Sequence, residues 1–443
     1  MQIIRSLPPP KIQLLTLATQ PNKQENNTPG WKPDASSPVW VLPFPGFFLC
    51  FPHKRVDVRF GINPGVLPLI GDEGHYSPTW RQPLGCLIVH SVLWYNHHIS
   101  SGRSGSMKRV LIIYTGGTIG MAKTPAGYTP QGAAFHALLN TLPELKDPIM
   151  PSWDIIDMDP LLDSSNITVH EWNLIGQMIA DHYDRYDGFV ILHGTDTMAY
   201  TASALSFMLR KNRKPVILTG SQIPLCEIRN DARDNLITTL MIAASDSVHE
   251  VCLYFGGKLL RGNRTMKYSA DDLVAFISPN YPPLAEAGIQ IRYNNKMLLP
   301  APDGPFSLQL MTDIPIGVIK VFPGIQFDLF QSIMTEKLKG IVIETFGAGN
   351  IPGNADALLP IIRKASDNGT IIIVCSQCPH GTVALGAYET SSALKEAGAI
   401  SGYDITTEAA VAKLYYLFSR GLSRDEIRHR MERSIRGEMS PRE

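Results

Sequence analysis

The segment Tyr114-Thr-Gly-Gly-Thr-Ile-Gly-Met121 constrains the fold of this chain more than any other, because its two central glycines directly follow a short apolar run. That run, 109–113, is rich in β-branched residues, which is typical of a strand buried on both faces of a parallel sheet. The glycines permit a sharp turn that a side chain would obstruct. Ligands of open α/β sheets bind at the carboxyl ends of the strands, so Thr115 and Thr118 lie where chemistry is usually done.

The glycine turn has three interpretations. It can be an ordinary tight turn after a first strand. A phosphate-binding loop is disfavoured, because the turn has neither a Gly-Lys-Ser/Thr ending nor the G-x-G-x-x-G spacing. The third interpretation is a threonine hydroxyl held at a strand end by a stiff turn, which is a weak nucleophile that needs a base from elsewhere in the chain.

Composition excludes several classes of protein. At 443 residues the chain has enough length for two or three domains. Lys+Arg and Asp+Glu are equal at 40 each, which gives no electrostatic argument for nucleic acid or an anionic membrane as a partner. No apolar run reaches the roughly 18 residues needed to span a bilayer, and the N-terminus lacks the organisation of a secretory signal. The cysteines are too sparse for a disulfide scaffold, which favours a reducing compartment; they are Cys50, Cys86, Cys226, Cys252, Cys375 and Cys378.

Residues 1–106 are a different kind of sequence from the rest. They hold 14 of the 34 prolines, which recur too often for an amphipathic helix. Their last part, 100–106, has the serine- and glycine-rich composition of a flexible linker. Met107, which follows it, resembles a natural translation start. We predict that this segment is disordered, or an upstream in-frame translation without a folded role. The alternative is a small accessory β domain, to which Val56–Phe60 would contribute a strand.

From residue 107 onward, apolar runs alternate with helical patterns, which indicates βαβ units. The sequence predicts a larger N-terminal parallel-sheet α/β domain over 107–293 that carries the catalytic residues. A linker rich in proline, asparagine and glycine follows over 294–313, and a smaller C-terminal Rossmann-like α/β domain covers 314–443. The strands expected in the first domain are 109–113, 153–158, 188–192, 215–219 and 251–255, and those in the second are 316–321, 340–344 and 370–374.

Polar side chains gather in the loops that follow these strands, and parallel topology places such loops on one rim of the sheet. They are Thr118, Tyr128, Ser164, Thr195, Asp196 and Lys267. Each also has an ordinary explanation. Asp196 can cap the next helix, Ser164 can form a turn, and Lys267 can be a surface lysine. Their joint occurrence favours a catalytic site.

Two other candidates are interpreted as structural. His193 stands at the end of a predicted strand, where we expect it to be a structural hydrogen-bonding group rather than a general base. The pair Cys375-x-x-Cys378 has no partner pair for zinc and no thioredoxin-like context, so it does not predict a metal or redox site.

The motifs together resemble a known family. Thr115-Gly-Gly-Thr-Ile-Gly120 and His193-Gly-Thr-Asp-Thr-Met198 are similar to the two signature motifs of L-asparaginases. The segments 262–267, 278–283 and 284–289 add a similarity to the type I, cytoplasmic bacterial enzymes. The resemblance runs from Met107 to the C-terminus and covers none of residues 1–106. It implies the two-domain asparaginase-like α/β fold.

The resemblance also implies a role for individual residues. Thr118 matches the nucleophile of the first motif, and Tyr128 matches the tyrosine of the flexible loop that closes over it. Lys267 matches the lysine that completes a Thr-Asp-Lys set with the second motif. The residues that match the substrate-binding positions are Asp163, Ser164, Ser165, Thr195 and Asp196.

The chemistry of amide hydrolysis fits these residue types. The reaction needs an activated hydroxyl, a site for a developing oxyanion and a proton for the leaving ammonia. A desolvated lysine serves as a base when an aspartate orients it, and backbone N–H groups of the glycine turn are candidate oxyanion donors. We expect L-asparagine to be hydrolysed to L-aspartate and ammonia through a threonine ester, with no metal and no organic cofactor. By resemblance the enzyme is cytoplasmic and forms a homodimer or homotetramer.

Type I enzymes also resemble one another in a second asparagine pocket that regulates activity. Ser376 and Cys378 match that pocket, whereas Glu344 replaces an expected arginine and Met266 an expected threonine. We therefore expect no activation by asparagine through this pocket. Two other functions remain open. One is that of an asparaginase-like component of a tRNA-dependent amidotransferase, which the N-terminal segment suggests, and the other is an inactive binding protein of the same fold.

Overall fold

The computed structural model describes residues 40–44, 47–51 and 107–441, the last range without 126, 353–356 and 388. The chain divides into two compact units, residues 1–102 and 103–443. In the first unit, β1 (Trp40–Phe44) and β2 (Phe47–Phe51) form an antiparallel hairpin. The predicted strand Val56–Phe60 lies outside the described residues.

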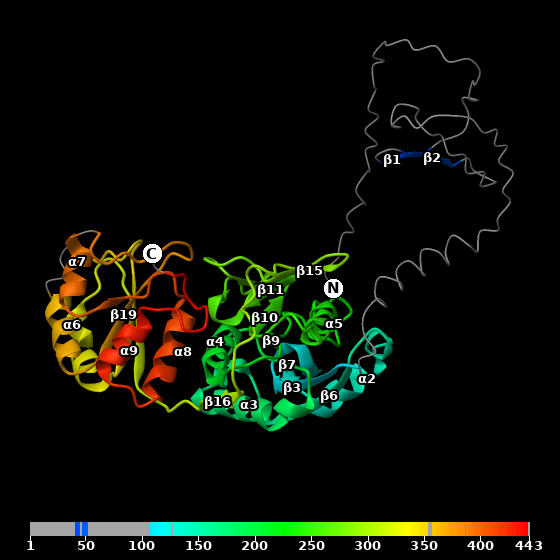
Figure 1. Ribbon diagram of the computed structural model, residues 1–443, viewed down its shortest axis with the longest axis horizontal. Coiled ribbons are helices and arrows are strands. Elements are labelled where there is room, and N and C mark those ends of the chain that lie inside the picture. Colours follow the sequence, from blue (N-terminus) through cyan, green and yellow to red (C-terminus); the bar gives the residue numbers. More distant parts are fainter. Residues whose placement is uncertain are drawn as a thin grey trace, which may run out of the picture. The chain divides into compact units, whose positions relative to one another are not determined.

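The second unit contains two α/β domains, as predicted (Figure 1). The larger one is built on an eight-stranded sheet. In spatial order its strands are β15 (Ile291–Tyr293), β14 (Ala285–Ala287), β11 (Lys258–Arg261), β10 (Val251–Phe255), β9 (Val216–Thr219), β7 (Gly188–Leu192), β3 (Arg109–Gly116) and β6 (Ser152–Leu162). The five strands from β10 to β6 are parallel, whereas β11, β14 and β15 add an antiparallel edge. The predicted parallel sheet is confirmed for the part that carries the motifs, whereas the antiparallel edge was not predicted from the sequence.

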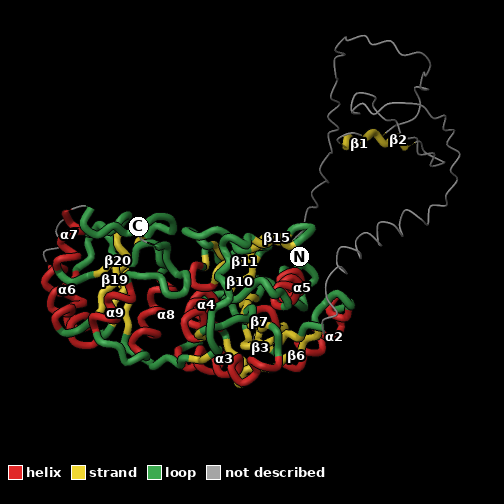
Figure 2. Tube along the Cα trace, viewed as in Figure 1, coloured by secondary structure: helices red, strands yellow, loops and turns green. Residues whose placement is uncertain are grey.

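Helices cover both faces of this sheet (Figure 2). They are α2 (Gly132–Thr141), α3 (Val169–His182), α4 (Met198–Met208) and α5 (Ala232–Ala243). Successive strand residues point to opposite faces, so Leu111 and Ile113 of β3 join the core formed with α3 and α4. Val110 and Ile112 join the core formed with α2 and α5. Burial on both faces explains the uninterrupted apolar run.

The smaller domain is a four-stranded parallel sheet with helices around it. Its strands are β17 (Ile316–Lys320), β18 (Gly340–Thr345), β19 (Ile371–Ser376) and β20 (Ile400–Ser401), and its helices are α6 (Leu358–Asp367), α7 (Glu389–Glu396), α8 (Thr407–Phe418) and α9 (Arg424–Met431). The predicted strands of this domain are present, whereas β20, α6 and α7 were not predicted from the sequence.

Short two-stranded ladders complete the second unit. They are β4 (Met121–Thr124) with β5 (Gly127–Pro130), β8 (Leu209–Arg210) with β16 (Ser307–Leu308), and β12 (Met266–Lys267) with β13 (Phe276–Ile277). Strand β16 falls within the predicted linker 294–313, and its pairing with β8 attaches part of that segment to the larger domain. Among the residues that the structure describes, the helices lack the combined length and apolar character that spanning a bilayer requires.

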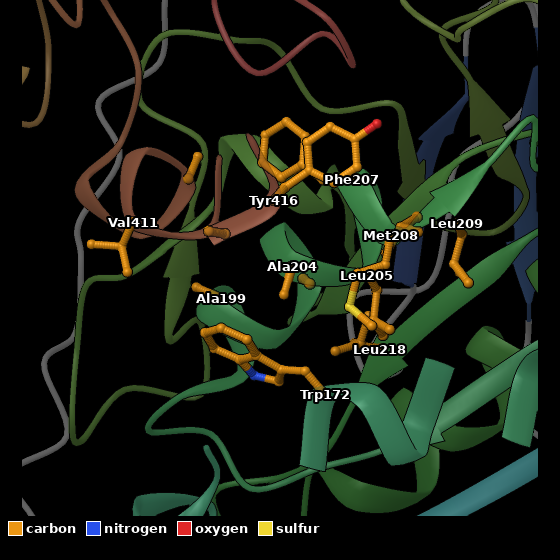
Figure 3. Packing of buried hydrophobic residues seen from close by; sticks show 14 of the residues in the cluster. Trp172, Ala199, Ala204, Leu205, Phe207, Met208, Leu209, Leu218, Val411 and Tyr416 are labelled. Carbon is orange, nitrogen blue, oxygen red and sulfur yellow. The ribbon is translucent and has the colours of Figure 1, made fainter. Parts of the chain in front are cut away.

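The two domains share a core through α4 and α8. Every residue of α4 except Tyr200 is buried, and Trp172 of α3 packs on the same helix (Figure 3). The Phe207 ring of α4 stacks on the Tyr416 ring of α8, with centroids 5.7 Å apart. Helix α4 begins directly after the second motif. That motif is therefore anchored to a helix that is buried over nearly its whole length.

Candidate active site

Three loops at the carboxyl ends of β3, β6 and β7 are in direct contact. We call them the Gly-Gly loop (116–118), the serine loop (163–166) and the His-Gly loop (193–197). A Cβ atom on Gly117 would lie 2.4 Å from the backbone nitrogen of Gly194, and one on Gly194 would lie 2.5 Å from the Ser164 hydroxyl oxygen. Gly117 also has a φ of 78°, a conformation that other residues rarely adopt. Glycine is therefore required because the loops touch, as well as because the chain turns.

The two threonines of the first motif have different surroundings. Thr115 is buried, and its hydroxyl donates to the Leu192 carbonyl at 3.0 Å, which ties β3 to β7. Thr118 begins the short helical turn η1 (Thr118–Gly120) and is partly exposed. The structure thus gives Thr115 a structural hydrogen bond and leaves Thr118 at the surface of the site.

The glycine turn offers fewer oxyanion donors than the sequence suggested. The Gly117 N–H donates to the Leu162 carbonyl at 3.2 Å, which joins the Gly-Gly loop to the end of β6. A donor that is already used by the backbone is not free for a developing oxyanion. Among the candidate N–H groups of this turn, that of Gly117 is therefore not available as an oxyanion donor.

The serine loop brings together the three predicted substrate-binding residues at positions 163–165. Asp163 and Ser165 are exposed, and the Asp163 carboxylate accepts from both the Ser165 N–H and its hydroxyl, each at 2.9 Å. Ser164 is buried against Gly194, and its carbonyl accepts from the Thr197 hydroxyl at 2.7 Å. This bond fixes the serine loop to the His-Gly loop.

The structure places three of the predicted catalytic groups in hydrogen-bond contact. The Lys267 ammonium donates to the Thr195 hydroxyl at 2.8 Å and to the Asp196 carboxylate at 2.6 Å. The Lys267 side chain is 20% exposed, whereas that of Asp196 is 65% exposed. Lysine, threonine and aspartate therefore form a connected set, with the lysine between the other two and the aspartate open to a ligand. Lys267 is not the ordinary surface lysine of the alternative interpretation.

Residues of the smaller domain and of the C-terminal segment hold the loop that leads to Lys267. Arg264 forms a buried ion pair with Asp404 at 2.9 Å and donates from Nε to the Gly437 carbonyl at 2.7 Å. The neighbouring Asn263 donates to the carbonyl of Arg436 at 3.0 Å. The sequence indicated a basic loop here but not these partners, because they lie more than a hundred residues away.

Gln222 is a site residue that the sequence did not reveal. Its side-chain oxygen accepts from the Thr195 hydroxyl at 3.3 Å, and its amide nitrogen donates to the Asp272 carbonyl at 3.2 Å. The Thr195 hydroxyl thus accepts a hydrogen bond from Lys267 and donates one to Gln222. The sequence showed only that Gln222 lies in the loop after the predicted strand 215–219, which does not distinguish it from its neighbours.

His193 has the structural role that we predicted. Its ring is fully buried, and Nδ1 lies 2.7 Å from the Gly194 carbonyl, which can only accept. Nδ1 therefore carries the proton, and Nε2 accepts from Thr201 at 2.9 Å. The Thr201 hydroxyl in turn accepts from the Trp172 indole at 3.1 Å. Burial lowers the pKa of His193 to about 4, so the ring is neutral at pH 7.

Tyr128 lies on the β4–β5 hairpin and is 45% exposed. Its hydroxyl donates to the Glu227 carboxylate at 2.6 Å. That hydrogen bond raises the pKa of the phenol, which keeps its proton. Unlike Lys267, Tyr128 is therefore not part of the Thr195–Asp196 hydrogen-bond set in the part of the chain that is described.

Both α/β domains of the second unit match models of a known family. The family model described as Asparaginase, N-terminal, matches residues 109–299, and the Glutaminase/Asparaginase C-terminal domain matches 315–431. The chain is 46% identical to L-asparaginase 1 of Escherichia coli K12 over 75% of its own length and 98% of that protein. This chain belongs to the asparaginase family. The crystal structure of L-asparaginase I from Vibrio cholerae, also 46% identical, superposes with a TM-score of 0.71 and covers 76% of this chain and 100% of that one.

Some relatives of this chain are named for a different activity. A glutamyl-tRNA(Gln) amidotransferase component from Thermococcus kodakarensis is 32% identical over 76% of this chain and 78% of that protein. Both kinds of relative match about three quarters of this chain. Family membership therefore establishes the fold, whereas the reaction depends on the residues of the site.

The four residues of the regulatory pocket implied by the resemblance line one cavity of about 170 Å³ in this member of the family; they are Met266, Glu344, Ser376 and Cys378. Glu344 accepts from the Thr407 hydroxyl at 2.7 Å. Glu408 lines the same cavity, and burial raises its pKa to about 7, with a further contribution from the nearby charge of Glu344. The carboxylate of Glu344 thus lies in the cavity where an arginine was expected.

Proposed function

We propose that this protein is an asparaginase that hydrolyses the side-chain amide of L-asparagine to L-aspartate and ammonia through an ester on Thr118. One observation carries the proposal. Lys267 bonds both Thr195 and Asp196, and the loop of these two residues touches the loop of Thr118. A nucleophile and a proton-transferring set thereby come from parts of the chain about 77 and 149 residues apart.

The proposed reaction has two steps. The Thr118 oxygen attacks the amide carbon while Lys267, reacting as the neutral amine, takes the Thr118 proton through the Thr195 hydroxyl, and the resulting ammonium returns a proton to the nitrogen that leaves as ammonia. Water then attacks the resulting ester and releases L-aspartate with Thr118 restored. In the resting state Gln222 provides an acceptor for the Thr195 hydroxyl, so this hydroxyl turns away from Gln222 when it donates elsewhere. No step needs a metal or an organic cofactor.

Charge at the rim of the site favours a zwitterionic amino acid as the substrate. The carboxylates of Asp163 and Asp196 are both exposed and suit an α-ammonium group. The Ser165 hydroxyl, which donates to Asp163 in the structure, would turn to donate to an α-carboxylate when the substrate binds. We assign substrate binding to these residues together with Ser164 and Thr195, as the resemblance implies. Steady-state kinetics with L-asparagine and L-glutamine will decide the preferred amide.

The experiment that tests the mechanism is Thr118→Ala in the purified protein, with ammonia release as the assay. We expect a loss of at least about a thousandfold in kcat, because removal of a nucleophile removes the covalent pathway. Thr118→Ser keeps a hydroxyl and is the matched control, for which we expect measurable activity. An unchanged rate of asparagine hydrolysis in Thr118→Ala would defeat the proposal.

The alternative function is that of an asparaginase-like component of a tRNA-dependent amidotransferase, which the similarity to the Thermococcus kodakarensis amidotransferase protein favours. The formal net charge of zero provides no evident surface for tRNA. Truncation to residues 107–443 separates the two functions. Full activity on free asparagine supports an independent asparaginase, whereas activity that requires residues 1–106 and a tRNA substrate supports the alternative.

Location, assembly and regulation are proposals of the same kind. We expect a cytoplasmic enzyme that forms a homodimer or homotetramer, which light scattering of the purified protein will test. We also expect hyperbolic kinetics, because Glu344 and Met266 depart from the regulatory pattern. Sigmoidal asparagine kinetics that disappear on replacement of Cys378 would show that the regulatory pocket operates.

A further inference from the structure

Three consecutive residues after β9 bond to the segment that runs from η1 to the β4–β5 hairpin. The Leu225 N–H donates to the carbonyl of Ile119 at 3.1 Å, directly beside Thr118. The Cys226 thiol lies 3.4 Å from the carbonyl of Met121, at the start of the hairpin. Glu227 accepts from Tyr128 at 2.6 Å, on the second strand of the hairpin. Residues 225–227 therefore contact the hairpin at Met121 and Tyr128 and the preceding turn at Ile119.

The loop that provides these bonds is braced by hydrogen bonds of its own. We call residues 222–231 the platform. The Asp231 carboxylate accepts from the backbone N–H groups of Gln222 and Ile223, both at 3.0 Å. The Asn230 side chain donates to the Glu227 carbonyl at 2.6 Å, and the Glu227 N–H donates to the Pro224 carbonyl at 3.0 Å. Both ends of the platform continue into buried elements, β9 and α5.

In contrast to the braced platform, the β4–β5 hairpin is largely exposed. Lys123 and Gly127 are exposed, as is Tyr128, whose ring contributes little to the core. The bond to Glu227 is of the charge-assisted kind, which is shorter and stronger than a bond between neutral groups. Since the pair is exposed, this bond contributes little to global stability. The bond instead fixes where the Tyr128 side chain lies.

We propose that Glu227 is a positioning residue that holds Tyr128 and the β4–β5 hairpin in place beside Thr118. The same platform also carries Gln222, which accepts from Thr195. The platform thus positions the hairpin through Glu227 and orients the Thr195 hydroxyl through Gln222. This inference rests on the proposed function, because it treats Tyr128 as part of the site.

A double-mutant cycle on kcat/KM tests the proposal. We expect Glu227→Ala and Tyr128→Phe each to lower kcat/KM for L-asparagine by about tenfold or more, because small displacements of a positioned group are costly. The double variant should be no slower than the slower single variant, since both changes remove the same bond. Glu227→Gln keeps an acceptor oxygen and should restore most of the rate. Multiplicative effects of the two changes, or a Glu227→Ala enzyme as fast as the wild type, overturn the proposal.

A second readout does not depend on catalysis. Trypsin can cut after Lys123 in the hairpin, and we expect this cleavage, identified by mass spectrometry, to be about tenfold faster in Glu227→Ala than in the wild type or Glu227→Gln. Ile228→Ala is the matched control, because Ile228 is a fully exposed residue of the same platform. If the wild type hydrolyses no amide, the proposed function fails, but the cleavage rates still show whether Glu227 holds the hairpin in place. Equal cleavage rates in all four proteins contradict it.

Discussion

The buried His193 makes the stability of this protein depend on pH, and His193→Gln tests that dependence. Burial lowers the pKa of the ring from 6.5 to about 4. Between these values the unfolded chain binds a proton that the folded chain does not, so stability rises with pH across the window. At 1.36 kcal/mol per pKa unit, the full effect is about 3 kcal/mol of unfolding free energy. It is present at pH 7 and lost as the pH falls toward 4.

The assay is urea unfolding at pH 7 and at pH 4.5, followed by circular dichroism. Glutamine can donate to the Gly194 carbonyl and accept from Thr201, as the neutral ring does, but it does not titrate. His193→Gln will change stability at both pH values. The informative quantity is the fall in unfolding free energy from pH 7 to pH 4.5. We expect this fall to be about 2 to 3 kcal/mol larger in the wild type than in His193→Gln.

An exposed histidine provides the control for this experiment. His170→Gln replaces an exposed histidine of α3 and should show the same loss between the two pH values as the wild type. If His193→Gln also loses as much stability as the wild type, the neutral buried ring is not the source of the pH dependence. The hydrogen-bond assignment of His193 would then be wrong.

Three further predictions follow from buried or crowded groups. Gly117→Ala should abolish most amide hydrolysis while the far-ultraviolet circular dichroism stays that of a folded protein, because its Cβ would collide with Gly194. Lys413→Met should lower the unfolding free energy by about 3 to 5 kcal/mol in urea titrations, because it removes the partner of the fully buried Glu438 carboxylate 2.7 Å away. The raised pKa of Glu408, about 7, makes a contribution opposite in sign to that of His193: it lowers the unfolding free energy as the pH rises from 4.5 through 7, since the folded state retains the proton longer. Glu408→Gln should lack this contribution, so its unfolding free energy in urea titrations should increase more than that of the wild type between pH 4.5 and pH 8.

Much of the fold was predictable because its signals are local. The strands Gly188–Leu192 and Val251–Phe255 have the predicted bounds, since an uninterrupted apolar run between polar ends marks a strand buried on both faces. The capping boxes that begin at Thr168 and Ser423 are local signals of the same kind, because each needs only a hydroxyl residue and a glutamate three residues later. The antiparallel edge was missed, because strands as short as Ala285–Ala287 carry no period of their own and form only on the neighbour that pairs with them.

The site divides in the same way. Thr118, Thr195, Asp196 and Lys267 could be named from motifs, because these motifs lie at strand ends in a recognisable order. No local pattern marks Gln222 or Glu227 as partners of the site, or Arg264 with Asp404 as the pair that fixes the loop before Lys267. These contacts join positions that are distant in sequence, and only packing brings them together.

The sequence by itself determined the alternation of strands and helices, the two glycine turns and the residue types available at the sheet rim, because these depend on backbone freedom and apolar periodicity within short segments. The tertiary structure alone decided which polar groups touch. It placed the Lys267 ammonium between Thr195 and Asp196, used the Thr115 hydroxyl as a structural bond, and set Tyr128 against Glu227. Hydrogen bonds act only within about 3 Å, and in this site that distance is fixed by elements from the whole length of residues 107–441.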